Sequence, residues 1–119
     1  MTPDTGCRIS EAVQEGIRVI TIGGAVNTAT SPEIREVLSA TGRERLPVVV
    51  DLENVSDVDS MGLITLALAS KRIHRTGGVM YLVGLPPGVS RVLRISGVDR
   101  SLSVYDDVAS AIEASRAQT

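Results

Sequence analysis

The sequence predicts a single α/β domain with a mixed, mostly parallel sheet of about five strands and helices largely on one side. Uninterrupted hydrophobic runs at 48–52 and 79–83 are typical of strands buried on both faces. Segments with helical spacing of apolar residues separate the runs, and this alternation favours parallel pairing. The 119 residues suffice for one hydrophobic core but not for two. We expect the domain to span residues 7–116.

A hairpin and a helix are predicted before the first hydrophobic run. Apolar residues alternate over 17–22, and a glycine-containing turn at 14–16 separates this segment from a looser strand at 8–13. We expect Gly23-Gly24 to end the second strand. The segment Thr30-Ser31-Pro32-Glu33 then predicts a helix start, either as a capping box from Thr30 to Glu33 or with proline at the first helical position.

The second half of the chain continues the alternation. A helix is predicted from about 61 to 75, apolar nearly all round in its first half and basic at its end. A third helix is expected over 86–97, opened by prolines and closed by a glycine. A short strand at 102–105 leads to Asp106-Asp107, whose carboxylates favour the start of a last helix.

Composition argues against several classes of protein. Twelve basic and fourteen acidic residues give a net charge of −2, and aromatic residues make up 2% of the chain, so no nucleic-acid surface is expected. The single cysteine, Cys7, excludes an internal disulfide and a cysteine-rich zinc site, and no cofactor is expected. Neither a signal peptide nor a membrane span is recognisable. These features favour a cytoplasmic globular domain without a membrane partner.

The segment 55–63 is the most informative part of the sequence, because it leads from a buried strand into a helix. It places Ser60 where backbone N–H groups are unpaired and negative charge is favoured. A serine there can cap the helix, which is worth ~1 kcal/mol. It can also carry a phosphate, which adds about −1.5 to −2 charges beside Asp57 and Asp59. From residue chemistry alone, the cap is the better interpretation.

Three segments together resemble a STAS domain, and more narrowly the bacterial anti-sigma factor antagonists. They are Asp59-Ser60-Met61-Gly62-Leu63, the glycine pair at 77–78 and the motif at 92–98, and the resemblance spans about 7–114. It implies that Ser60 is phosphorylated by a partner anti-sigma factor, a serine kinase that uses ATP. It further implies that the unphosphorylated domain binds this anti-sigma factor and frees the sigma factor, and that a PP2C-type phosphatase resets the switch.

The resemblance also implies a partner surface at one end of the domain. Both connections that form it should emerge at the carboxyl ends of parallel strands. Met61 stands where many relatives have a second hydroxyl residue, and Ala25 and Asn27 stand where relatives commonly have acids. A STAS module of another complex, for lipid transport or stress signalling, that is never phosphorylated is therefore the alternative. The expected surface residues are Gly24, Ala25, Val26, Asn27, Thr28, Asp57, Asp59, Ser60, Met61, Gly62 and Ile64.

An enzymatic role is not expected. A serine on a strand-to-helix turn suits a hydrolase nucleophile, but the Gly-x-Ser-x-Gly pattern is absent around Ser60. The only histidine, His74, follows fourteen positions later on the same predicted helix, which is a separation of roughly 20 Å. The sequence contains no phosphate-binding or dinucleotide-binding glycine motif.

Overall fold

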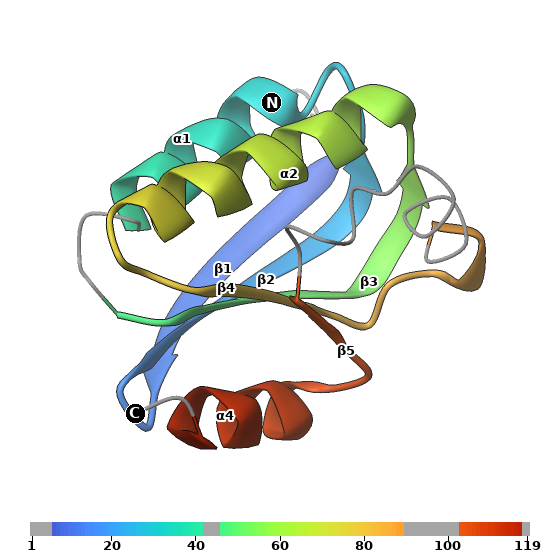
Figure 1. Ribbon diagram of the computed structural model, residues 1–119. Coiled ribbons are helices and arrows are strands. Elements are labelled where there is room, and N and C mark those ends of the chain that lie inside the picture. The colour runs from blue at the N-terminus through green and yellow to red at the C-terminus, as the bar shows by residue number, and fades with distance from the viewer. Residues whose placement is uncertain (1–5, 42–45, 90–102, 118–119) are drawn as a thin grey trace.

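The computed structural model describes residues 6–41, 46–89 and 103–117, which form a five-stranded sheet with helices on both faces (Figure 1). The order of strands across the sheet is the order along the chain. The elements are β1 (Cys7–Gln14), β2 (Ile17–Val26), α1 (Ser31–Thr41), β3 (Val48–Val58), α2 (Ser60–Arg75), β4 (Met80–Val83), β5 (Ser103–Tyr105) and α4 (Val108–Ala117).

The sheet has the predicted mixed topology. β1 pairs with β2 in antiparallel register, and the pairs β2–β3, β3–β4 and β4–β5 are parallel. The hairpin turns at Glu15 and Gly16, whose φ angles are 54° and 79°. Glycine adopts a positive φ without steric cost, which explains the presence of Gly16 in this turn. The predicted turn is confirmed.

Alternation along the strands divides the core between the two faces of the sheet. Ile20 and Ile22 pack with the residues of α1 and α2, whereas Ile17 and Val19 pack with those of α4. The predicted helical layer on one side is therefore formed by α1 and α2. The last helix, α4, covers the opposite face and buries Ile112 there (Figure 1).

Two strands continue further than predicted. β2 runs past Gly23-Gly24 to Val26, because irregularities on both sides of this pair let the ladder with β3 resume. Gly24 has a φ of 91°, and a side-chain carbon on it would lie 2.2 Å from the carbonyl oxygen of Gly6. The pair is thus a bulge within the strand. Correspondingly, β3 extends to Val58, where it pairs with the end of β2 and carries the chain to the site described below.

The predicted third helix lies mostly outside the described residues. Within 86–97, the described residues end at Val89, and 87–89 are helical. The motif at 92–98 on which part of the family resemblance depends is likewise outside the described ranges.

Candidate functional site

The connections after β2 and β3 meet at one end of the sheet, as predicted. The backbone N–H of Asp59 donates to the carbonyl of Val26 over 3.1 Å. The backbone N–H of Thr28 in turn donates to Oδ2 of Asp59 over 3.3 Å. These two bonds hold the β2–α1 loop directly against the start of α2.

A reciprocal pair of hydrogen bonds fixes the β2–α1 loop. Asn27 N–H donates to Oγ1 of Thr30 over 2.9 Å, and Thr30 N–H donates to Oδ1 of Asn27 over 3.1 Å. The Thr30 hydroxyl also donates to the carbonyl of Ala25, and the Ser31 hydroxyl donates to that of Asn27. This is the geometry of a capping box, one turn before the predicted position: Thr30 pairs with Asn27, whereas the sequence suggested Glu33. Within the loop itself, these hydrogen bonds involve only neutral groups.

Asp59, and not Ser60, caps α2. Its backbone is extended, with φ −97° and ψ 179°, and its Oδ1 accepts the N–H of Gly62 over 2.8 Å. Aspartate and serine cap helices about equally well, and the register of the strand end decides which one does so here. Ser60 becomes the first residue of the helix. It is exposed, and no other part of the described chain forms a hydrogen bond with its hydroxyl.

Two predicted surface residues are buried and position the others. A side-chain carbon on Gly62 would lie 2.3 Å from the carbonyl oxygen of Val26, so only glycine allows α2 to approach β2 this closely. Val26 itself is completely buried. Since neither residue offers a side chain to a partner, their contribution is to set the distance between the helix and the sheet.

The exposed part of the site combines hydroxyl, acidic and apolar side chains. Thr28, Asp57 and Ser60 are exposed, while Met61 is 44% and Ile64 50% exposed. Leu68, which was not among the predicted surface residues, is also 50% exposed and lies one helical turn after Ile64. Its spacing from Met61 was visible in the sequence, but an apolar residue in a largely apolar helix is usually assigned to the core. We call Met61, Ile64 and Leu68 the exposed stripe of α2.

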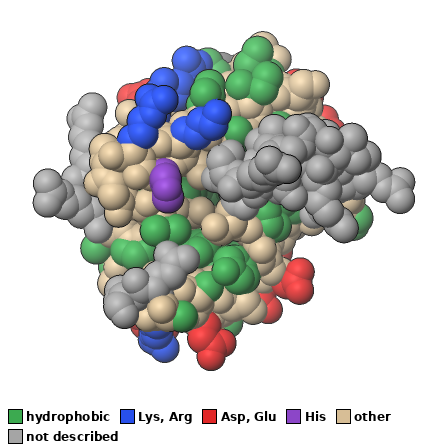
Figure 2. Space-filling model, in the orientation of Figure 1, with side chains coloured by type: hydrophobic (Ala, Val, Ile, Leu, Met, Phe, Trp, Pro, Cys, Tyr) green, Lys and Arg blue, Asp and Glu red, His purple; other side chains and the backbone are tan. Residues whose placement is uncertain are grey.

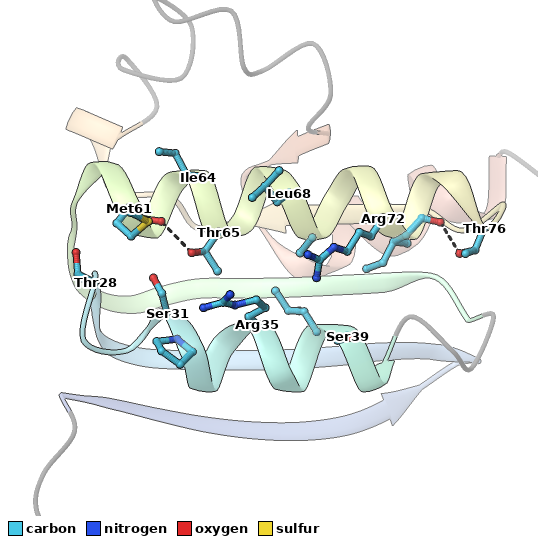
Figure 3. Close-up of a pocket in the computed structure, with 14 residues that line it drawn as sticks. Thr28, Ser31, Arg35, Ser39, Met61, Ile64, Thr65, Leu68, Arg72 and Thr76 are labelled. Carbon is cyan, nitrogen blue, oxygen red and sulfur yellow. Dashed lines mark hydrogen bonds between the residues drawn. The ribbon is translucent and has the colours of Figure 1, made fainter.

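A groove that was not predicted from the sequence lies between α1 and α2. Figure 3 shows Arg35 of α1 and Arg72 of α2 reaching into the space between the two helices, with Met61 and Thr28 at the end that carries Ser60. Single-sequence patterns show which face of a helix is polar, but not how far apart two helices pack, so this groove was not predictable.

Other kinds of site find no support among the described residues. Ser60 and His74 lie at opposite ends of α2, so the separation predicted from the sequence holds. No group of His, Cys, Asp and Glu side chains in the described ranges is arranged to hold a metal ion. No helix in those ranges is long and apolar enough to cross a membrane.

The candidate site thus combines an exposed serine at a helix start with a fixed loop and exposed apolar side chains. The chain belongs to the STAS domain family, whose model matches residues 8–111. This confirms the resemblance seen in the sequence.

Relatives and solved structures point within the family. The anti-sigma-B factor antagonist of Staphylococcus aureus strain NCTC 8325 is 29% identical over 99 residues, which are 82% of this chain and 92% of the relative. The anti-sigma F factor antagonist of Paenibacillus polymyxa is 27% identical and is covered to 85% by the match, which again spans 82% of this chain. An anti-sigma factor antagonist from Mycobacterium paratuberculosis has the same fold, with a TM-score of 0.84 at 22% identity over 98% of this chain and 99% of that one.

Proposed function

We propose that this protein is an anti-sigma factor antagonist that is switched by phosphorylation of Ser60. In the unphosphorylated state it binds an anti-sigma factor of the serine kinase type in the cytoplasm and thereby releases the sigma factor. A PP2C-type phosphatase restores this state. The similarity to named antagonists supports the class of partner. The observation that carries the switch is the exposed hydroxyl of Ser60, which forms no hydrogen bond within the described ranges and lies in a surface of fixed shape.

The surroundings of Ser60 explain how a phosphate would block binding without unfolding the domain. The helix N-terminus attracts an anion, but Asp59 already accepts the Gly62 N–H there, and its carboxylate repels a second negative group. A phosphate on Ser60 would therefore extend outward, toward the partner. A docked anti-sigma factor would then encounter both its bulk and its charge.

Incubation with kinase and ATP tests the modification. We expect one phosphate on the wild-type protein after incubation with an anti-sigma kinase from the same genome that binds it, and none on Ser60→Ala. Intact-mass measurement followed by peptide mapping gives the number and the position of the phosphates. Phosphate at another residue, or none with every kinase that binds, would overturn the proposed switch.

Charge substitution at Ser60 tests the consequence for binding. Ser60→Asp should weaken the complex with the anti-sigma factor at least about tenfold, near 1.4 kcal/mol, whereas Ser60→Ala should bind about as well as wild type. Both variants should keep their stability, because Asp59 and not Ser60 caps α2. Calorimetric titration gives the affinities. Since aspartate carries less charge than a phosphate, the phosphorylated protein itself is the decisive sample if Ser60→Asp binds normally.

A second function, a STAS module of another complex that is never phosphorylated, is favoured by one observation. Ala25 and Asn27 leave the β2–α1 loop without a carboxylate, so any partner that depends on acids in this loop finds none. Capture of a partner without kinase homology, together with the absence of phosphate on Ser60, would select this function.

A further inference from the structure

The groove between α1 and α2 is a second binding feature of the helical layer. It has a volume of about 760 Å³ and is lined by residues of both helices. α1 and α2 lie side by side with their N-termini at the same end, so the groove begins next to the Ser60 site (Figure 3). Its hollow shape follows from short side chains between the helices, namely Ser31, Ser39, Thr65 and Ala69.

The charges along the groove are unbalanced. Arg35 and Arg72 line it from opposite helices, and neither forms an ion pair with any described carboxylate. The last turn of α2 also carries Arg75 and His74, which lie outside the lining of the groove. Figure 2 shows Lys and Arg side chains gathered over this end of the helical layer, and hydrophobic side chains toward the end where α2 begins. The groove thus carries one arginine in each half, Arg35 nearer the Ser60 end and Arg72 nearer the opposite end, among apolar side chains (Figure 3).

The dimensions suit a helix better than a small molecule. The lining residues of α2 extend from Met61 to Thr76, which corresponds to about 22 Å of helix rise. Ile64 and Leu68 at its border are each half exposed, so the groove is open along its side. Small-molecule sites enclose most of the ligand surface, whereas open apolar grooves between helices bind amphipathic helices.

We infer that this groove receives an amphipathic helix of the anti-sigma factor, with apolar residues over the exposed stripe of α2 and carboxylates between Arg35 and Arg72. The inference rests on the proposed function, since it describes the chemistry of that same partner. Two facts support this occupant: Arg35 and Arg72, which form no ion pair within the described part of the chain, are complementary to acidic side chains, and the groove is continuous with the Ser60 surface. Phosphorylation would then act at one end of a longer interface.

A matched pair of charge reversals tests the role of Arg72. Arg72→Glu places the new charge in the groove. Lys71→Glu makes the same change one residue earlier on the same helix, at an exposed position outside the groove. With purified anti-sigma factor, we expect Arg72→Glu to weaken binding at least about tenfold and Lys71→Glu less than about threefold. The affinity of wild type should fall as the salt concentration rises, and the double variant Arg35→Glu, Arg72→Glu should lose this decrease.

A photo-crosslinker at position 68 identifies the occupant. Leu68→p-benzoylphenylalanine should attach to a segment of the anti-sigma factor that carries Asp or Glu at helical spacing, and mass spectrometry locates that segment. Attachment to a basic or apolar segment would overturn the inference that an acidic amphipathic helix occupies the groove. Equal effects of Arg72→Glu and Lys71→Glu, in a protein whose binding still responds to Ser60→Asp, would overturn it too. Either result leaves the proposed function standing. A lipid or other amphiphile found in the groove by native mass spectrometry also overturns the inference. Failure of wild type to bind any anti-sigma factor overturns both proposals.

Discussion

Gly62 lies where α2 packs directly against the end of β2, and a single added methyl group tests how strictly this distance is set. The new carbon in Gly62→Ala would lie 2.3 Å from a backbone oxygen of Val26, so the helix has to move. We expect a loss of about 1–3 kcal/mol in the free energy of unfolding, measured by urea titration. Gly88→Ala is the control, because its added carbon meets no described atom within 4 Å and should change stability by less than about 0.5 kcal/mol.

Equal stability of the two alanine variants would contradict this account, because it would mean that α2 moves away from Val26 without cost. If Gly62→Ala is destabilised as expected, it should also bind the partner more weakly. The methyl group displaces the start of the helix and with it the hydroxyl of Ser60.

At the scale of single residues, the sequence identified the right segment but assigned the helix cap to the wrong residue within it. Ser60, Asp59 and their neighbours were predicted to lie at a helix start, and they do. The assignment of the cap to Ser60 was wrong, because β3 extends to Val58 and leaves Asp59 as the last extended residue. This extension of β3 depends on its pairing with the end of β2. Such pairing is a tertiary contact, which the local sequence pattern does not show.

Asp107 performs for α4 the function that Asp59 performs for α2. Its Oδ1 accepts the N–H of Ser110 over 2.8 Å. This bond and a further one from the Ser110 side chain lower the pKa of the Asp107 carboxyl, because both stabilise its charged form. Of the two acids predicted to start the last helix, only Asp107 forms a hydrogen bond among the described residues.

We expect Asp107→Ala to lower the thermal midpoint at neutral pH and Asp106→Ala to leave it nearly unchanged. A carboxyl whose pKa is lowered on folding contributes stability above its unfolded-state pKa, and this stability is lost as the pH falls through the lowered value. The difference between wild type and Asp107→Ala should therefore shrink as the solution is acidified. Calorimetric scans from neutral to acid pH measure this difference in thermal midpoint. A difference that grows toward acid pH would contradict the capping role of Asp107.

At the scale of elements, the sequence predicted types better than ends and distances. The alternation of strands and helices and the parallel pairing were readable because buried runs and helical spacing are local signals. The predicted end of β2 was wrong because a Gly-Gly pair is typical of a turn. In the structure Gly23-Gly24 forms a bulge, and the pairing of β2 with β3 resumes after it. The side of the sheet that α4 covers was not specified, since its short apolar face suits either side.

The position of α4 on the opposite face of the sheet from α2 leads to a prediction for the whole molecule (Figure 1). Phosphorylation of Ser60 should change the surface and not the fold. In ¹H–¹⁵N spectra of the unmodified and phosphorylated protein, we expect amide shifts to change over 25–30 and 57–64. The chemical shifts of the amides in β5 and α4 should not change. Changes throughout α4 would instead indicate a rearrangement of the whole domain, which a partner would then recognise.

The reciprocal bonds between Asn27 and Thr30 have a consequence for how proteins with this fold tell their partners apart. Since an amide oxygen anchors the loop, a carboxylate oxygen at the same atom would anchor it equally well, and the exchange of one nitrogen for one oxygen would add a full negative charge. The shape of the loop and the charge of its side chain can therefore change independently at this position. A genome that encodes several such domains can give each of them a different surface charge on the same fold. Each domain can then reject the partners of the others without any change of fold.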